Sequence, residues 1–494
     1  MAEQNIKDKT VKGTIWSAAD AFLGQGVTFI VGLVLARLLS PGEYGLIGIV
    51  TIFITILLGI VDSGFSNALI RKIKVDEEDY NTLFIVNMAM SVLMYALLFF
   101  GSPVIARFFA QSQLVLLCRV LGLLLIFQAL SIVQYTILSR KIDFKTKTKA
   151  SVISAVASGI LGITMAHVGF GVWSLVVQQL SRQLIYSVCL SFFNRWRPKL
   201  EFSSGSFRYM WGFGWKLMLS GLLERTWNQL YQMVVGKYYS AASLGQYTRA
   251  DQFANIFSSN LTSIVQRVSY PVLSQIQNDK ERMVAVYRRV IKLTMFVTAT
   301  LMISLAAVSE PLLYCLIGPQ WYEASTYLPL ICFNLVLYPL HAINLNILQV
   351  KERTDIFLYL EIVKKTIAII PVSIGVFFNI YWMLMASTFL GVICFFLNSY
   401  YSGKELGYTS WMQLRDVAHI FALAVTIALA VYFLKYLPIN YWIVLPLQVL
   451  VGTAVFFIVC NKTKIPEYEE TKMMMTLIWR KVILNTKKYN NFKS

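Results

Sequence analysis

The sequence contains little charge. Of its 494 residues, 14% are Asp, Glu, Lys or Arg, whereas soluble domains contain about 25%. Hydrophobic residues make up 57%, and the mean hydropathy is +0.61. These values exclude a water-soluble enzyme of two or three domains and predict an all-α integral membrane protein. At about 20 apolar residues per crossing, the chain has room for a dozen or more spanning helices.

The sequence also lacks the residue patterns of several chemistries. Its six cysteines form no CxxC pair and none lies near a histidine, so the spacing indicates neither a disulfide framework nor a metal site. His167, His341 and His419 lie in separate segments without ligand spacing. No GxxxxGK[ST] loop, which would bind and hydrolyse ATP, is present. We therefore expect no metal, no cofactor and no catalytic residue.

Long hydrophobic runs, separated by short polar gaps, fill the chain. They predict about fourteen transmembrane helices. The segments are 13–37, 43–68, 81–101, 114–138, 150–168, 171–193, 211–237, 247–270, 293–317, 325–349, 356–378, 380–402, 417–437 and 440–460. The first run is too long for a signal-peptide core, so we expect it to be a retained helix that follows a cytoplasmic N-terminus.

The positive charges are distributed unevenly between the two sides. With the N-terminus inside, 32 of the 44 Lys and Arg residues fall in gaps on the cytoplasmic side. The opposite gaps hold only Arg107 and Lys435, with Arg37 and Lys237 at their margins. This is the distribution of the positive-inside rule, and it places both termini in the cytoplasm. Membrane topology thus explains the net charge of +19, and no nucleic-acid partner is expected.

A short sequence recurs 200 residues further along the chain. Residues 34–45 (VLARLLSPGEYG) align with residues 234–245 (VVGKYYSAASLG), with Val, a basic residue, Ser and Gly in register. The repeat predicts two six-helix bundles related by a pseudo-two-fold axis along the membrane normal. The predicted parts are 1–200 (first bundle), 201–410 (second bundle), 411–465 (two appended helices) and 466–494 (basic cytoplasmic tail).

Two predicted helices carry polar stripes. In segment 211–237 every fourth residue from Lys216 to Gln232 is polar, and segment 247–270 carries polar residues largely along one side. The residues are Lys216, Ser220, Glu224, Asn228 and Gln232 in the first, and Arg249, Asp251, Gln252, Asn255 and Arg267 in the second. A charge at membrane depth costs about 2.5–3.5 kcal/mol, so such side chains face a bundle interior or a water-filled cavity. Either ion pairs, Glu224 with Arg225 or Arg249 with Asp251, or a hydrated cavity between the halves would account for them. Continuous polar faces on two neighbouring helices favour the cavity.

The excess of basic residues on these stripes favours an anionic substrate, because Arg side chains match phosphate oxygens. Arg225 and Arg249 lie deepest, whereas Lys216 and Arg267 lie near the cytoplasmic mouth, where interfacial anchoring explains them equally well. The candidate coupling-ion residues are Asp20, Glu224 and Asp251, and compensation of nearby Arg charge is an equally good interpretation of these carboxylates.

Four short motifs resemble those of a known family. LARLLSPGEYG (35–45), DSGFS (62–66), LGQYTRA (244–250) and YPVLS (270–274) resemble sequences of Wzx-type and teichuronic-acid export flippases. These belong to the multidrug/oligosaccharidyl-lipid/polysaccharide exporter superfamily. Relatives often carry an acidic residue late in the seventh helix, where this chain has Asn228, Gln229 and Gln232. The resemblance therefore transfers no ion site to that position.

The resemblance implies that the chain moves an undecaprenyl-pyrophosphate-linked oligosaccharide across the bacterial inner membrane by rocking of two bundles. Arg225 and Arg249 would hold the pyrophosphate, and Lys216, Arg37 and Arg267 would guide it. The sugar would contact the neutral polar residues, whose donors and acceptors match hydroxyls: Asn228, Gln232, Gln252 and Asn255. Expected partners are this lipid-linked sugar, membrane lipid and polysaccharide polymerase or assembly proteins. The alternatives are a cation-coupled multidrug exporter and a membrane polymerase or ligase. The Arg excess argues against the exporter, and the lack of a large outer loop argues against the enzyme.

Overall fold

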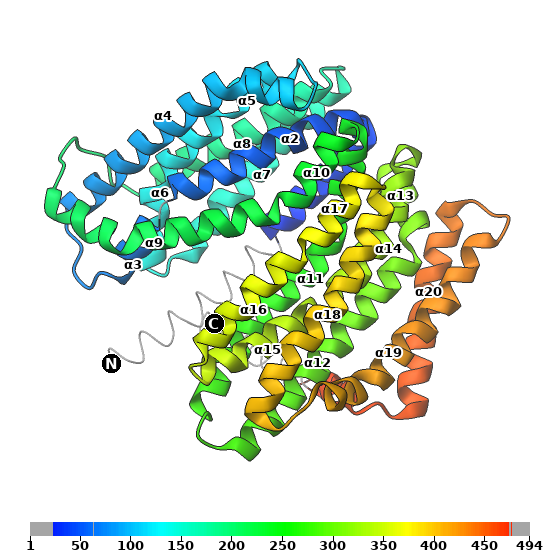
Figure 1. Ribbon diagram of the computed structural model, residues 1–494. Coiled ribbons are helices and arrows are strands. Elements are labelled where there is room, and N and C mark those ends of the chain that lie inside the picture. Colours follow the sequence, from blue (N-terminus) through cyan, green and yellow to red (C-terminus); the bar gives the residue numbers. More distant parts are fainter. Residues whose placement is uncertain (1–22, 63, 474–475, 477–494) are drawn as a thin grey trace, which may run out of the picture. The chain divides into compact units, whose positions relative to one another are not determined.

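The computed structural model describes residues 23–62, 64–473 and 476, and every element within them is a helix (Figure 1). The chain divides into two compact units, Met1–Thr248 and Arg249–Ser494. The first unit holds the helix Leu23–Leu38, α2 (Pro41–Val61), α3 (Phe65–Arg71), α4 (Glu77–Phe108), α5 (Leu114–Leu121), α6 (Leu123–Arg140), α7 (Phe144–His167), α8 (Val172–Phe193), α9 (Ser204–Asn228), α10 (Leu230–Tyr238) and the first turns of α11 (Ala241–Gln275).

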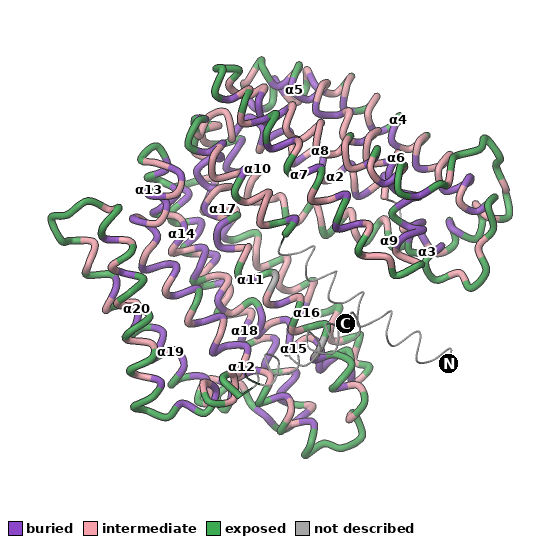
Figure 2. The backbone as a smooth tube through the Cα atoms, turned by 180° about the vertical axis from the view of Figure 1, so that it is seen from behind, coloured by how far each residue is buried: buried purple, intermediate pink, exposed green. Residues whose placement is uncertain are grey.

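The second unit holds the rest of α11 and ten further elements. They are α12 (Lys280–Ala307), α13 (Ser309–Ile317), η1 (Pro319–Trp321), α14 (Tyr322–Leu335), α15 (Tyr338–Val350), α16 (Thr354–Ile367), α17 (Ile369–Phe377), α18 (Ile380–Leu406), α19 (Ser410–Tyr432) with η2 (Phe433–Tyr436), and α20 (Tyr441–Thr463). In the first unit α7 and α6 both pack on α8, and in the second α12 packs on α19. Exposed positions concentrate in the turns between helices (Figure 2).

Nine helical stretches of the described chain are long and apolar enough to cross a membrane. They are Pro41–Arg71, Glu77–Phe108, Leu114–Arg140, Phe144–His167, Lys280–Ala307, Pro319–Val350, Ile380–Leu406, Ser410–Tyr436 and Tyr441–Thr463. The prediction of an all-α membrane protein is therefore confirmed. Each of the predicted hydrophobic segments overlaps a helix, the first of them from Leu23 onward. The total of about fourteen spans and the division into two six-helix bundles stay predictions.

The two copies of the repeated sequence begin their helices in the same way. The hydroxyl of Ser40 accepts a hydrogen bond from the Glu43 N–H, and the Glu43 carboxylate accepts from the Ser40 N–H at 2.7 Å, which forms a capping box at the start of α2. At the start of α11, the hydroxyl of Ser240 accepts from the Ser243 N–H at 3.0 Å. In both copies a serine thus satisfies a backbone N–H that the helix leaves without an intrahelical partner.

The same two helix starts cross in close contact. A Cβ atom on Gly45 would lie 1.6 Å from the carbonyl oxygen of Ala241, and a Cβ on Gly245 would lie 1.9 Å from the carbonyl oxygen of Pro41. Only glycine fits at either position, because no side chain tolerates a backbone atom at that distance. Residues that are 200 positions apart in the sequence, Gly45 and Gly245, therefore make equivalent contacts, each with the first residue of the other's helix.

Candidate functional site

Arg225 lies on the side of α9 that contacts α2. A Cβ on Gly59 would be 2.9 Å from the Arg225 Cδ, so this glycine leaves room for the arginine stem. The guanidinium then reaches the C-cap residue of α2, with 3.7 Å between Arg225 Nη2 and Asp62 Oδ2. The two side chains are 38% and 50% exposed, respectively. The guanidinium is therefore accessible to an anion other than Asp62.

The predicted stripe of α9 lies beside this contact. Lys216, Ser220, Glu224 and Asn228 are all exposed. Leu217, which follows Lys216, contacts the start of α3: a Cβ on Gly64, whose φ is +68°, would be 2.8 Å from the Leu217 Cβ. Glu224 forms no ion pair among the described residues, so the pairing of Glu224 with Arg225 considered from the sequence is not observed.

The helix is interrupted before the fifth member of the stripe. Helix α9 ends at Asn228, and the Gln229 N–H donates to the carbonyls of Arg225 and Thr226 before α10 begins. Gln232 is half-buried on α10, beyond this break. Arg37 is exposed in the last turn of the helix Leu23–Leu38. Asp20 lies outside the described residues.

Arg249 belongs to the second unit and is held differently. Its Nη1 donates to the Gln252 Oε1 at 2.9 Å, and its guanidinium carbon lies 5.9 Å from the centre of the Trp321 ring. Trp321, in η1, is completely buried. A neutral amide and an aromatic face therefore orient this cation. The pairing of Asp251 with Arg249 considered from the sequence is not observed among the described residues, because side chains two positions apart point to different sides of a helix.

The remaining polar residues of α11 divide between two sides of the helix. Asp251 accepts a hydrogen bond from Asn255 Nδ2 at 2.9 Å. Gln252 and Arg267 are exposed. On the packed side, Ser258 donates to the carbonyl of Leu335 at 3.0 Å, and Ser269 accepts from the Asn346 amide at 3.3 Å. These bonds attach α11 to α14 and α15, which leaves the exposed polar residues available to a ligand.

Arg249 presents guanidinium donors beside the neutral amide of Gln252, an arrangement that matches phosphate oxygens and sugar hydroxyls. The described residues contain no group of three or more His, Cys, Asp or Glu side chains that would hold a metal ion. The sequence alone identified none of Asp62, Gly59 and Trp321 as site residues. None of them belongs to the polar stripes, and Trp321 and Gly59 carry no charge that would draw attention to them.

Comparison with known proteins identifies a family. Residues 34–326, more than half of the chain, match the family described as "Polysaccharide biosynthesis protein". The succinoglycan biosynthesis transport protein ExoT of Rhizobium meliloti is 27% identical over 67% of this chain and 67% of its own length. The teichuronic acid biosynthesis protein TuaB of Bacillus subtilis is 28% identical over 63% of this chain, which spans 64% of that relative. The lipopolysaccharide biosynthesis protein WzxC of Escherichia coli is 21% identical over 75% of this chain and 76% of its own.

Two solved structures share the fold. The lipid II flippase MurJ, in an inward closed conformation, aligns with a TM-score of 0.69 and 18% identity, over 91% of this chain and 97% of its own. An inward-facing multidrug resistance MATE transporter of the MOP superfamily aligns with a TM-score of 0.60 and 15% identity, over 82% of this chain and 98% of its own. At these identities the likeness concerns the fold.

Proposed function

Because this chain belongs to the polysaccharide biosynthesis protein family, a family of transporters and not of enzymes, we propose that it is a flippase for an undecaprenyl-pyrophosphate-linked oligosaccharide. The oligosaccharide would be a repeat unit of capsule, O-antigen or exopolysaccharide. The protein is a multi-pass membrane protein with the fold of the exporter superfamily that includes MurJ and the MATE transporters. We place it in the bacterial cytoplasmic membrane, with both termini in the cytoplasm.

The observation that carries the proposal is the half-exposed pair of Arg225 and Asp62, next to the exposed polar stripe of α9. A pyrophosphate that displaces Asp62 gains charge-assisted hydrogen bonds from the guanidinium. It gives up little in return, because the pair it breaks is weak. The stripe then offers donors and acceptors to the attached sugar. The polyprenyl tail stays in lipid throughout.

Arg249 is the second proposed contact for the pyrophosphate. Its guanidinium is oriented by Gln252 and by the ring of Trp321. Lys216, Arg267 and Arg37 are exposed cations and are proposed to guide the lipid towards or away from these arginines. The names of ExoT, TuaB and WzxC include succinoglycan, teichuronic acid and lipopolysaccharide. We infer that the cargo here is an oligosaccharide of this general kind and that a polymerase or another assembly protein receives it.

Transport in proteoliposomes tests the proposal. The probe is a fluorescent undecaprenyl-pyrophosphate oligosaccharide, and the variants are Arg225→Gln and Arg249→Gln. The control is Arg282→Gln, which removes an exposed positive charge from the first turn of α12. We expect each test variant to lose about tenfold or more of the flipping rate, as the loss of a charge-assisted bond predicts, and the control to match the wild type. Export of cationic dyes without movement of any lipid-linked sugar would instead favour a multidrug exporter.

Glu224, Asp251 and Asp20 remain the proposed coupling-ion residues. Asp251 is supported by its hydrogen bond from Asn255, which leaves one carboxylate oxygen for a cation or a proton. The test is Asp251→Asn, with flipping measured under imposed sodium and pH gradients. A coupling role predicts that the variant no longer responds to the gradient, whereas a charge-compensating role predicts an unchanged response.

A further inference from the structure

A second basic site lies on the first unit, where α3 and the following turn meet α9 (Figure 1). A hollow of about 720 Å³ opens there, and its walls are basic and aromatic. The lining residues are Ala68, Arg71, Lys72, Ile73, Lys74, Tyr209 and Phe213. We call this hollow the α3–α9 pocket. Phe213 precedes Arg225 by about 18 Å along α9, at 1.5 Å per residue, so the pocket is distinct from the Arg225 site.

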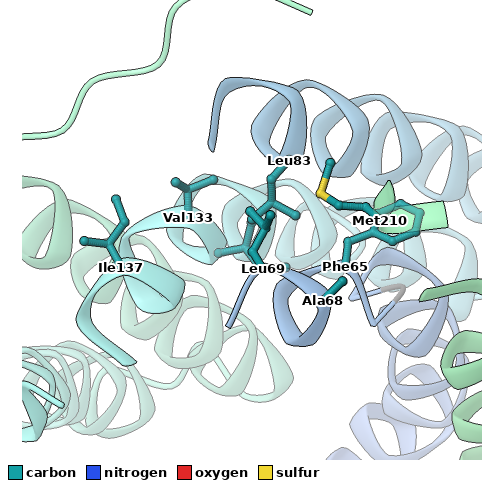
Figure 3. Packing of buried hydrophobic residues seen from close by; sticks show 8 residues of the cluster. Phe65, Ala68, Leu69, Leu83, Val133, Ile137 and Met210 are labelled. Carbon is teal, nitrogen blue, oxygen red and sulfur yellow. The ribbon is translucent and has the colours of Figure 1, made fainter. Parts of the chain in front are cut away.

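A buried apolar cluster holds together the helices that form the pocket. Phe65, Ala68 and Leu69 of α3 pack with side chains of α4, α6 and α9 (Figure 3). The partners are Leu83, Val133, Ile137 and Met210 (Figure 3). The loop that precedes α9 is also attached to α4, since the Ser203 N–H donates to the Thr82 hydroxyl at 3.0 Å. The positions of both walls are therefore set by packing and do not depend on a ligand.

Arg140 binds the carbonyl groups at the end of α3, which makes this helix end less repulsive to an anion. Its Nη1 donates to the carbonyls of Leu69, Ile70 and Lys72, at 3.1 Å for Ile70 and 2.7 Å for Lys72. The last carbonyls of a helix otherwise carry a partial negative charge, which repels anions. By binding them, the guanidinium removes that repulsion and fixes the shape of the turn that carries Arg71 and Lys74.

Two cations of the pocket are available to a ligand. Lys72 is used within the protein, because its Nζ lies 2.7 Å from the buried carboxylate of Asp79. Arg71 and Lys74 are exposed and form no ion pair among the described residues. The guanidinium carbon of Arg71 lies 5.3 Å from the centre of the Phe213 ring, which orients it along the wall.

The acidic start of α4 does not neutralise these cations. Of its four carboxylates, Asp79 pairs with Lys72, and Glu77 pairs with Lys199 at 3.1 Å. The other two, Asp76 and Glu78, are not among the residues that line the pocket. The pocket therefore carries a net positive charge.

Apolar side chains beside these cations indicate a membrane surface. Ile73, between Lys72 and Lys74, is 93% exposed, and Tyr209 is 45% exposed. On the same helix, the rings of Phe207 and Trp211 lie one turn apart and stack with their centres 5.8 Å from each other. Aromatic residues gather where a protein crosses the lipid headgroups, and an exposed Ile is favourable there because it reaches acyl chains. A soluble anion would not account for Ile73.

We propose that the α3–α9 pocket binds the phosphate group of a membrane lipid, through Arg71 and Lys74. Two lipids supply such a group: an anionic phospholipid of the bilayer and a polyprenyl pyrophosphate. The proposal concerns binding and does not rest on the flippase function proposed above. It holds whether or not the protein transports a sugar.

The test measures lipid binding to the purified full chain by native mass spectrometry. The probes are phosphatidylglycerol, undecaprenyl pyrophosphate and, as a neutral reference, phosphatidylcholine. The variant Arg71→Gln/Lys74→Gln removes both available cations and leaves the Lys72–Asp79 pair in place. The control Lys141→Gln/Lys149→Gln removes two exposed cations of the same unit that do not line the pocket.

We expect the pocket variant to bind phosphatidylglycerol or undecaprenyl pyrophosphate roughly tenfold more weakly, and the control to change by less than twofold. Competition between the two lipids then identifies which of them is preferred, and either preference supports the proposal. Equal binding by wild type and pocket variant would overturn it, as would an equal loss in the control. Displacement of the lipid by low-millimolar inorganic phosphate would also overturn the assignment to a lipid-borne group. The single variant Lys74→Gln, with a smaller expected loss, serves if the double variant folds poorly.

Discussion

The contact between the starts of α2 and α11 differs in kind from the arginine sites on α9 and α11. At the crossing, Gly45 and Gly245 bring backbones into direct contact, and no group there is able to change partner. At the arginine sites side chains hold the cations: Arg225 contacts the half-exposed Asp62, and Arg249 contacts Gln252 and the buried ring of Trp321. Tight glycine packing thus fixes how α2 and α11 meet, whereas side-chain contacts leave the two arginines available to an anionic ligand.

The largest effect is expected from filling the crossing. Gly45→Ala or Gly245→Ala places a methyl group on a carbonyl of the other helix, which forces backbone shifts that cost about 3 kcal/mol or more. Thermal unfolding in detergent measures the loss. Gly42→Ala is the matched control on α2, because its Cβ would meet nothing closer than 3.9 Å. Equal midpoints for Gly45→Ala and Gly42→Ala would contradict the described contact.

A smaller effect on stability, but a clear one on function, is expected from releasing Arg225. Asp62→Asn removes a half-exposed partner, so we expect the free energy of unfolding to change by less than about 1 kcal/mol. The half-saturating concentration of the lipid-linked sugar should stay equal or fall, because the ligand no longer competes with a carboxylate. Arg225→Gln should raise it. A rise of similar size in Asp62→Asn would show that the ion pair itself, and not a free arginine, is the functional state.

The contact between Arg249 and Trp321 is expected to contribute less to the free energy of unfolding than the glycine contacts. A double-mutant cycle of Arg249→Gln and Trp321→Phe, read by thermal unfolding, should give a coupling of about 0.5–2 kcal/mol. The same cycle with Asp251→Asn in place of Arg249→Gln is the control and should give a coupling near zero, because Asp251 is bound by Asn255. Equal couplings in both cycles would mean that Trp321 acts only through packing.

The smallest effect concerns an exposed pair, Arg353 and Asp355, that serves as a reference for Arg225 and Asp62. Arg353 lies 3.2 Å from Asp355 just before a predicted span, and this hydrogen-bonded cation lowers the pKa of Asp355 from its usual 3.8. A lowered pKa contributes stability above pH 3.8, and that stability is lost as the pH falls through the folded-state value. The unfolding midpoint of the wild type should therefore be slightly higher than that of Asp355→Asn at pH 6, and the difference should shrink as the pH is lowered below 3.8. A difference that stays the same over this range of pH would contradict this origin.

Several features of the chain follow from its sequence alone. Hydropathy predicted the helical membrane protein. The period of four placed Lys216, Ser220, Glu224 and Asn228 along one side of a helix, and all four are exposed on α9, as are most other residues of that helix. The family motifs pointed to the polysaccharide exporters, to whose family the chain belongs. Hydropathy and helical periodicity can be predicted from sequence because they depend on residues a few positions apart, which the helix itself brings onto one face.

The partners of the charged residues were decided by tertiary structure. The sequence offered Glu224 as the partner of Arg225, but the packing of α9 on α2 brings Asp62 to it, and Gly59 makes room for the stem. Trp321 reaches Arg249 because η1 places this one buried ring beside α11. The α3–α9 pocket likewise joins Arg71 to Phe213 across two helices. Local sequence determines which face of a helix is polar, whereas which groups meet across helices depends on the packing of distant segments, and hydropathy and periodicity carry no information about that packing.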